Sequence, residues 1–321
     1  MTISADKRVF YNEVVSSALA QNTRIAYDKG WLCFEDYCIL RNIDPFSITP
    51  EQTADFIIDL ATSPRPKSGK TLSMGTVSLY RSGINKKYVE VEKTSPMNHP
   101  KVVAVFKGLA RIKGTAPRRV NALREHDIKR MLGRCADTPI GRRDAAILSL
   151  GFAGALRRSE ICALTMDDVE FIEPQSGKDF WKMFIYIRKS KTDQEGRGHK
   201  IAIPEGKYVK PIKRLRDWLQ MSGITEGYLF QTMKRGGGLR GLPMHHSDIP
   251  RLVKHYAALI GLDPKQVSGH SLRAGFVTSA AVHHARLDKI MEVTRHSNPS
   301  TVMRYIRDVD SFVDHAGEKF L

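Results

Sequence analysis

The chain lacks the features that mark secreted, metal-binding and membrane proteins. Its four cysteines, Cys33, Cys38, Cys135 and Cys162, have neither CxxC spacing nor a nearby histidine pair, which argues against a disulfide framework and a zinc site. No run approaches about 18 uninterrupted apolar residues, and Met1–Phe10 has no apolar stretch of the kind found in signal peptides. We therefore expect no metal, no membrane contact and a cytoplasmic location.

Acidic residues are too few to balance the basic ones. The 321 residues include 51 Lys and Arg against 34 Asp and Glu, which gives a formal net charge of +17. Residues 1–117 hold 16 basic and 11 acidic side chains, and residues 118–321 hold 35 and 23. Without a membrane anchor, such an excess most simply predicts nucleic acid as the partner. Because both parts are basic, we expect both to contact it.

Breaks at proline and glycine divide the chain into two domains. Apolar residues recur at helical spacing in the first part, which predicts a helical domain over residues 1–113. The helices expected there cover residues 11–42, 50–60, 73–88 and 101–113. Residues 114–122 are basic and include glycine and proline, as is typical of an interdomain linker, and residues 123–321 form the second domain.

Several cations in this part are candidates for contact with nucleic acid. Arg81, Lys86 and Lys87 fall on the exposed side of the helix expected at 73–88, which fits either a DNA major groove or an ordinary solvated face. Arg118 and Arg119 lie in the linker. There they would follow a phosphate backbone while the two domains close around a duplex as a clamp.

The second domain combines buried helices with a few strands. Residues 142–156 form a nearly continuous apolar pattern, which predicts a buried helix. Residues 184–187 and 200–204 have strand character, and the polar loop between them carries cations that include Lys189 and Lys191. The expected fold class is mainly α with a small antiparallel β-sheet (α+β).

Histidine, arginine and tyrosine gather between Gly269 and Tyr305. His270 and Arg273 are three residues apart, so in a helix they share one face and couple a titratable group to a fixed cation. A helix is expected because no glycine or proline occurs from Phe276 to His296. By itself, this pattern also fits an amphipathic helix with a solvated polar end.

Other residues along the chain decide between these interpretations. The complete set is Arg157, Glu160, Lys191, His270, Arg273, His296 and Tyr305. In this order and approximate spacing the set resembles the tyrosine recombinase (phage integrase) family, in particular Cre-like two-domain site-specific recombinases. Residues 155–161 and 269–275 are similar to the family's first and second boxes, and residues 302–306 to its nucleophile segment. Arg295, before His296, departs from the pattern because family members often have glycine there.

The resemblance implies a reaction. Breaking a DNA phosphodiester without metal needs a nucleophile, cations for the phosphorane and an acid for the leaving sugar oxygen. By resemblance, Tyr305 attacks to give a 3′-phosphotyrosyl link, which conserves the bond energy, so no cofactor is expected. His270 is the expected base, since free tyrosine has a pKa of about 10 and needs help to lose its proton.

The remaining residues take supporting roles by the same resemblance. Arg157 and Arg273 are assigned to the non-bridging phosphate oxygens, because a guanidinium holds two oxygens at once and stays charged. Lys191 is the expected acid for the 5′-hydroxyl, with Lys189 as its competitor and otherwise a DNA contact. His296 would donate a hydrogen bond to the phosphate, and Glu160 would orient His270 or an arginine.

The family also implies an assembly. Residues 1–113 would be a core-binding domain and residues 123–321 a catalytic domain, closed on duplex DNA with inverted-repeat recombination sites. A homotetramer would hold two such sites in a synaptic complex. A helix at 308–321 would dock in trans on a neighbouring protomer or, alternatively, on its own domain. Such a protein would be bacterial or phage-encoded and associated with the nucleoid.

Two other functions stay open at this point. One is a type IB-like topoisomerase that acts as a monomer, and the other is a non-catalytic DNA-binding regulator. The presence of every catalytic residue type argues against the regulator. Only residues 1–10 precede the first expected helix, so no separate arm-binding domain is expected.

Overall fold

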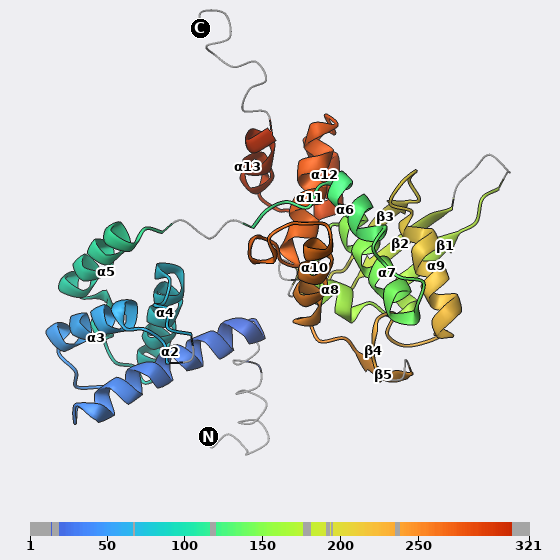
Figure 1. Cartoon of the computed structure of the whole chain (residues 1–321). Coiled ribbons are helices and arrows are strands. Elements are labelled where there is room, and N and C mark those ends of the chain that lie inside the picture. Colours follow the sequence, from blue (N-terminus) through green and yellow to red (C-terminus); the bar gives the residue numbers. More distant parts are fainter. Residues whose placement is uncertain are drawn as a thin grey trace, which may run out of the picture. The chain divides into compact units, whose positions relative to one another are not determined.

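The computed structural model describes residues 14, 19–66, 68–115, 120–175, 181–190, 193, 195–234 and 238–309, with side chains through Tyr305 in the last helix (Figure 1). The chain forms two compact units, Met1–Arg118 and Arg119–Leu321, which we call the N-terminal and the C-terminal unit. Each unit packs around a hydrophobic core of its own.

Helices are the only regular elements among the described residues of the N-terminal unit. Its elements are α2 (Gln21–Leu40), α3 (Pro50–Thr62), α4 (Met74–Glu90), the 3-10 helix η1 (Pro96–Asn98) and α5 (Pro100–Lys113). Helix α3 starts at a capping box, in which the side chains of Thr49 and Gln52 each accept a hydrogen bond from the other residue's backbone N–H. This pair satisfies N–H groups that no carbonyl of the helix reaches.

Helices α2 and α4 approach closely because each has a glycine facing the other helix. A Cβ on Gly30 would lie 2.7 Å from the Cα of Tyr80, and a Cβ on Gly83 would lie 2.6 Å from the Cα of Tyr27. A larger residue at either position would push the helices apart. Around this contact the core is aromatic and centres on Phe34, which is fully buried.

The C-terminal unit combines helices with two small antiparallel sheets. Its helices are α6 (Glu125–Leu132), α7 (Pro139–Ala153), α8 (Arg158–Ala163), α9 (Pro211–Ser222), α10 (Asp248–Leu259), α11 (His270–Val282), α12 (Leu287–Thr294) and α13 (Pro299–Val309), with 3-10 turns η2 (Met166–Asp168) and η3 (Pro264–Gln266). One sheet has the order β1 (Val169–Ile172), β2 (Lys182–Ile187), β3 (His199–Pro204), and the other pairs β4 (Gln231–Met233) with β5 (Leu239–Pro243). The predicted fold class, mainly α with a small antiparallel sheet, is confirmed.

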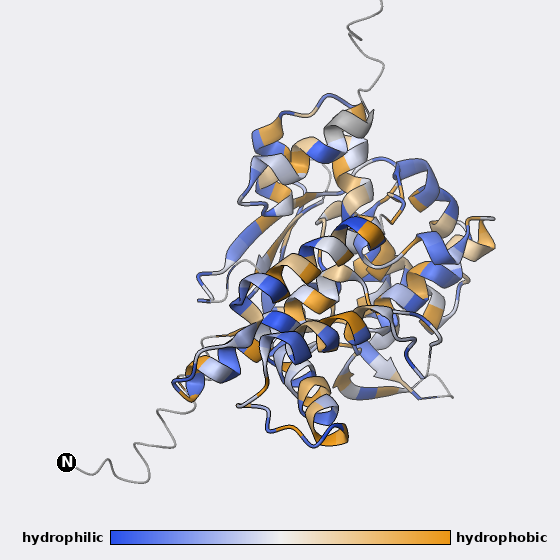
Figure 2. Ribbon diagram, turned by 90° about the vertical axis from the view of Figure 1, so that its left-hand side faces the viewer, coloured by the Kyte–Doolittle hydropathy of each residue, from blue (hydrophilic) through white to orange (hydrophobic). Residues whose placement is uncertain are grey.

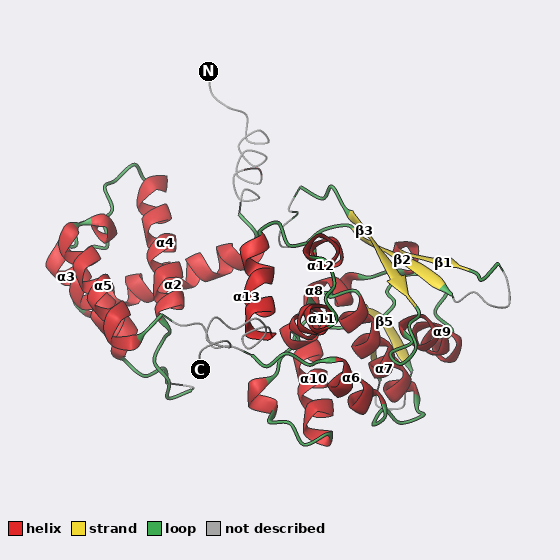
Figure 3. Cartoon of the chain, turned by 90° about the horizontal axis from the view of Figure 1, so that it is seen from above, coloured by secondary structure: helices red, strands yellow, loops and turns green. Residues whose placement is uncertain are grey.

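The three-stranded sheet covers one side of the C-terminal core (Figure 3). Val169 pairs with Ile185, and Ile185 pairs with Ile201, so the three strands present a row of apolar side chains. Alternation along β2 buries Met183, Ile185 and Ile187 and leaves the residues between them more exposed. The buried face belongs to the same hydrophobic cluster as α7 and α9, which pack against each other.

The helix expected over residues 276–296 is two helices in the structure. Helix α11 ends at Val282, and α12 begins at Leu287. Between them His284 has a φ of 53°, a left-handed conformation that histidine adopts more readily than most side chains do. The prediction of a continuous helix was therefore wrong, because a turn of this kind needs neither glycine nor proline. The break lets α12 contact both α11 and α13.

Most helices are apolar on one side and polar on the other. Orange and blue segments alternate along them in Figure 2, as expected for helices that lie on a core and face water. Within the described part of the chain, none of the helices has the length and apolar character needed to cross a bilayer.

Candidate active site

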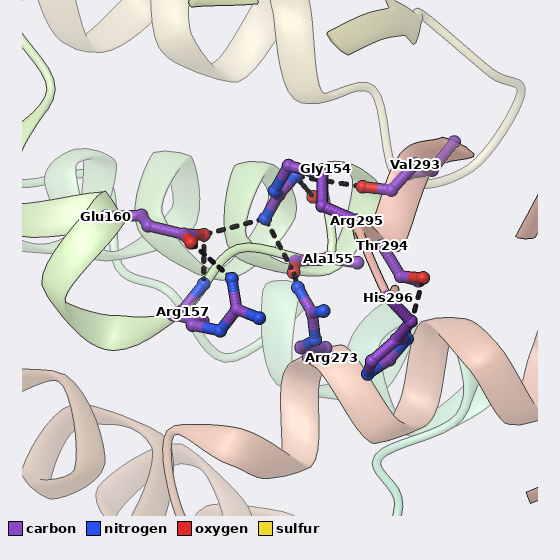
Figure 4. Close-up of polar contacts among 9 residues, drawn as sticks. All are labelled: Gly154, Ala155, Arg157, Glu160, Arg273, Val293, Thr294, Arg295 and His296. Atoms are coloured by element: carbon purple, nitrogen blue, oxygen red, sulfur yellow. Dashed lines mark hydrogen bonds and ion pairs between the residues drawn. The ribbon is translucent and has the colours of Figure 1, made fainter. Parts of the chain in front are cut away.

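The first part of the site is the sharp turn between α7 and α8 (Figure 4). Ala155 has a φ of 44°, and the chain then enters α8 with Arg157 as the N-cap residue. Glu160, one turn into α8, accepts a hydrogen bond from the Arg157 backbone N–H at Oε2 (2.8 Å) and another from Nη1 of Arg157 at Oε1 (2.7 Å). Because its side chain is only 1% exposed, Glu160 holds Arg157 through an ion pair that water screens little.

Arg273 reaches the same turn from α11. Its Nη1 donates to the carbonyl oxygen of Ala155 at 2.8 Å, and the residue is only 1% exposed. Among the described residues, Nη2 of Arg273 has no hydrogen-bond partner. Burial, together with Arg157 and Arg295, lowers the pKa of Arg273 to about 9, which still leaves it charged at neutral pH. Such a buried and incompletely paired cation favours an anion nearby.

Arg295, which interrupts the family pattern, lies in the centre of this cluster. Its φ is 57°, in the left-handed region that glycine adopts without strain, and this explains why glycine suits the position. Its Nη2 donates to Oε2 of Glu160 at 2.7 Å, and its Nη1 donates to the carbonyl oxygen of Val293 at 2.9 Å. In the sequence Arg295 is only a departure from the family pattern, and nothing near it along the chain predicts its contact with Glu160.

His296 follows Arg295 and lies beside Thr294. The distance from His296 Nδ1 to Thr294 Oγ1 is 2.8 Å, and the Thr294 hydroxyl donates to the carbonyl oxygen of Ile290 at 2.7 Å. Because that hydroxyl has one hydrogen, Nδ1 must be the donor to Thr294, which leaves Nε2 as the site of any further proton. Burial, reinforced by Arg273 and Arg157, lowers the pKa of His296 to about 4, so the imidazole is neutral at pH 7.

The predicted nucleophile and base meet at the other end of the site. His270 is the first residue of α11, and its Nε2 lies 3.3 Å from the hydroxyl of Tyr305 on α13 of the same chain. Tyr305 is partly buried against a small cluster of Val277, Ile290 and Val302. Packing against this cluster orients the phenol of Tyr305, and His270 lies within hydrogen-bonding reach of its hydroxyl.

Gly275 allows the chain to hold α11 in place. A Cβ at this position would lie 1.7 Å from the carbonyl oxygen of Leu123, so only glycine permits the crossing. The N–H of Leu123 also donates to the carbonyl oxygen of Ser271 at 3.1 Å. The segment that enters the C-terminal unit is thus fastened across the helix that carries His270 and Arg273.

The structure therefore brings together six of the seven predicted catalytic residues, and the seventh, Lys191, lies outside the described residues. The candidate DNA contacts Arg118 and Arg119 lie outside them as well. Lys189 is exposed just after β2.

The three candidate DNA contacts of the N-terminal unit already have partners. Arg81 donates from Nε to the carbonyl oxygen of Met97 at 3.0 Å, and Lys86 and Lys87 both form ion pairs with Glu90. To contact a phosphate, each of these side chains would have to share or leave its present partner.

Three arginines thus gather at the turn that follows α7, and a histidine lies within hydrogen-bonding distance of a tyrosine hydroxyl, an arrangement that can bind an anion and activate a phenol. Residues 121–311 match the phage integrase family. An integrase/recombinase xerD homolog of Selenomonas ruminantium is 32% identical over 303 residues, which cover 92% of this chain and 84% of the relative. The tyrosine recombinase XerD of Pseudomonas putida is 24% identical over 303 residues, which cover 91% of this chain and 88% of that one. The chain belongs to the phage integrase family of tyrosine recombinases.

Solved structures show the same fold. The XerH site-specific recombinase, in a post-cleavage complex with a palindromic difH substrate, has a TM-score of 0.64 and 16% identity, covering 91% of this chain and 78% of XerH. A lambda integrase dimer bound to a COC′ core site has a TM-score of 0.60 and 17% identity, covering 93% of this chain and 75% of the integrase. The predictions of family and of a recombinase enzyme are confirmed, and neither the topoisomerase nor the regulator is favoured.

Proposed function

We propose that this protein is a site-specific recombinase that cleaves and rejoins duplex DNA through a 3′-phosphotyrosyl intermediate on Tyr305. The observation that carries the proposal is the 3.3 Å separation between the Tyr305 hydroxyl and Nε2 of His270. A base within hydrogen-bonding reach lowers the barrier to using a phenol of pKa about 10 as a nucleophile. The Tyr305 oxygen then bonds to phosphorus while the bond to the 5′-oxygen breaks.

Arg157 and Arg273 are the proposed ligands of the non-bridging oxygens. Arg157 gives only one guanidinium nitrogen, Nη1, to Glu160, and Nη2 of Arg273 has no partner within the described structure. Both side chains therefore retain donors for a phosphate. Donors that are already in place when charge develops stabilise a transition state without further reorganisation.

His296 is the proposed donor to the same phosphate, and this role requires a proton on Nε2. Since Thr294 engages Nδ1, a neutral His296 presents Nε2 as an acceptor. A phosphate next to the ring would raise the pKa of His296 from about 4, because a nearby negative charge favours the charged imidazole. Proton uptake on DNA binding is therefore part of the proposal.

The general acid for the 5′-oxygen is proposed to be Lys191, with Lys189 as the alternative. Replacing each lysine with alanine separates them on a substrate with a 5′-phosphorothiolate, whose sulfur leaves without a proton. The variant that lacks the acid would cleave this substrate at nearly the normal rate and the ordinary substrate slowly.

Duplex DNA is the proposed partner, in agreement with the net charge of +17 and with the DNA complexes of XerH and lambda integrase. Residues 1–113 would form the core-binding domain, 114–122 the linker and 123–321 the catalytic domain. We further propose inverted-repeat sites, a homotetramer on two sites, and docking in trans of the helix expected over residues 308–321, of which residues 310–321 lie outside the described part of the chain. The relatives of this protein come from bacteria, so we propose that it is located in the cytoplasm, on the nucleoid.

The test uses nicked suicide duplexes built from inverted repeats in the DNA that flanks the gene. We expect the wild-type protein to form a denaturant-resistant protein–DNA adduct and Tyr305→Phe to form none. Tyr208→Phe is the matched control, because Tyr208 is an exposed tyrosine outside the site, and it should form the adduct normally. Non-covalent binding without any adduct would refute the proposal. Exchange of strands between two sites separates a recombinase from a topoisomerase.

A further inference from the structure

The carboxylate of Glu160 is shared by two arginines. Arg157 occupies Oε1 with its side chain and Oε2 with its backbone N–H, and Arg295 occupies Oε2 at 2.7 Å. The side chains of Glu160 and Arg295 are 1% and 5% exposed. With Arg273, the described part of this cluster holds three guanidinium groups and one carboxylate, all screened little by water.

Arg295 is held by contacts that a surface arginine would not have. Its Nη1 donates to the carbonyl oxygen of Val293, and its Nη2 also approaches the carbonyl oxygen of Ala155 at 3.4 Å, the atom that Arg273 uses. The backbone at Arg295 is left-handed, which is unfavourable for a side chain with a Cβ. A buried charge on an unfavourable backbone persists only where the surroundings require it, which suggests a function.

We propose that Arg295 is a positioning residue that offsets the negative charge of Glu160, so that Arg157 presents its full positive charge to the scissile phosphate. In a simple Arg157–Glu160 pair, the carboxylate would cancel most of the field of the guanidinium at the phosphate. With Arg295 on the other side, Glu160 still fixes Arg157 in place but no longer neutralises it. Arg295 thereby supplies a charge that glycine at this position cannot supply.

The effect should appear in the rate of reaction more than in DNA affinity. A phosphodiester has one negative charge, and attack by a tyrosine oxygen that has lost its proton gives a phosphorane with two. An added positive charge therefore stabilises the transition state more than the bound substrate. The inference rests on the proposed function, since it assumes that the phosphate reacts at this site.

The decisive experiment is a double-mutant cycle of Arg295→Gln and Glu160→Gln, measured as single-turnover cleavage of the suicide duplex. Arg295→Gln should lower the rate about 100-fold, as loss of one charge-stabilising group commonly does, with DNA affinity changed by less than about threefold. The double variant should cleave at least about tenfold faster than Arg295→Gln, because the charge that Arg295 offsets is gone. The double variant has no Glu160 carboxylate left buried without Arg295. It therefore tests the proposal even if Arg295→Gln folds poorly.

Two further measurements separate charge from structure. On a methylphosphonate duplex, in which a neutral methyl replaces a non-bridging oxygen, the loss in Arg295→Gln should shrink to less than about tenfold. Arg286→Gln removes an exposed arginine paired with Asp288, so it makes the same change in net charge and should leave both rates near wild type.

Three outcomes are distinguishable. Arg295 would be only structural if the decreases in cleavage rate add in the double variant and are equal on the ordinary and the methylphosphonate duplexes. It would have no role if Arg295→Gln cleaves at the normal rate. Either result overturns the inference. If the wild-type protein forms no adduct with any duplex, it is the proposed function that fails.

Discussion

The arginine side chains compared here lie in different environments in the two units of this protein. In the N-terminal unit Arg41 pairs with Asp59 with both side chains well exposed, and the half-buried Arg81 donates to the backbone carbonyl of Met97. In the C-terminal unit Arg273 and Arg295 are 1% and 9% exposed, and Arg295 shares the Glu160 carboxylate with Arg157. Exposed cations each add a little affinity that salt weakens, whereas buried cations oppose folding and act strongly on an anion beside them.

Removing an arginine should therefore change stability in opposite directions in the two units. The largest effect of all is expected on catalysis, for an arginine of the C-terminal unit. Arg273→Met should lower adduct formation about 100- to 1,000-fold, because one preorganised donor to the phosphorane is lost. The same change should raise the free energy of unfolding by at least about 1 kcal/mol, because an incompletely paired buried charge disappears. Suicide-duplex cleavage and thermal unfolding measure the two quantities.

Arg81→Met is the matched change in the N-terminal unit. It removes the hydrogen bond to Met97 without relieving a buried charge, so stability should fall or stay level. A lower melting temperature for Arg273→Met would contradict the contrast between the units.

Glycine substitutions compare the packing of the two units. Gly83→Ala places a Cβ against the Tyr27 backbone and should destabilise the N-terminal unit by about 1–3 kcal/mol. Gly275→Ala forces α11 away from Leu123, so it should also reduce the cleavage rate on DNA that is already bound. Gly108→Ala, with nothing within 4 Å, is the control and should stabilise α5 slightly. Equal cleavage rates in the Gly83 and Gly275 variants would show that the crossing does not position α11.

His296 should make the stability of the C-terminal unit depend on pH. Its pKa is lowered to about 4 in the folded protein, against about 6.5 for unfolded histidine. The unfolded chain therefore binds more protons between these values, and the stabilisation present above pH 6.5 is lost as the pH falls toward 4. Replacing His296 with asparagine should reduce the slope of the unfolding free energy against pH in this window. The reduction corresponds to at most about one bound proton. An unchanged slope would place His296 in a more exposed environment.

The smallest effect is expected for a surface lysine of the N-terminal unit. Lys86→Ala should weaken DNA binding and reduce the log–log salt slope by about 0.9 if Lys86 contacts one phosphate. Its ion pair with Glu90 must be shared for this contact, which keeps the change in affinity small. Lys213→Ala is the matched control, because Lys213 forms an ion pair of the same i,i+4 spacing with Asp217 in the C-terminal unit. Equal slopes for the wild type and Lys86→Ala would remove Lys86 from the interface.

Much of the fold was predictable because its signals are local. The fold class and the pairing of β2 with β3 followed from periodicity and from the polar loop between two short apolar runs. The pairing of β4 with β5 was missed, since those strands are short and the segment between them reads as a loop. The break at His284 was missed because the turn uses histidine in a conformation usually marked by glycine.

By itself, the sequence determined which residues are the candidates for contact with a phosphate. Arg157, Glu160, His270, Arg273 and Tyr305 could be proposed because their order and approximate spacing resemble the family pattern, and the spacing of three residues places Arg157 with Glu160 and His270 with Arg273. Only the tertiary structure decided how Arg295 is used, since its partner Glu160 lies 135 residues away and meets it through the packing of α8 and α12 around a common turn. Spacing along a helix is a local property, whereas a buried ion pair depends on which distant segments exclude water together.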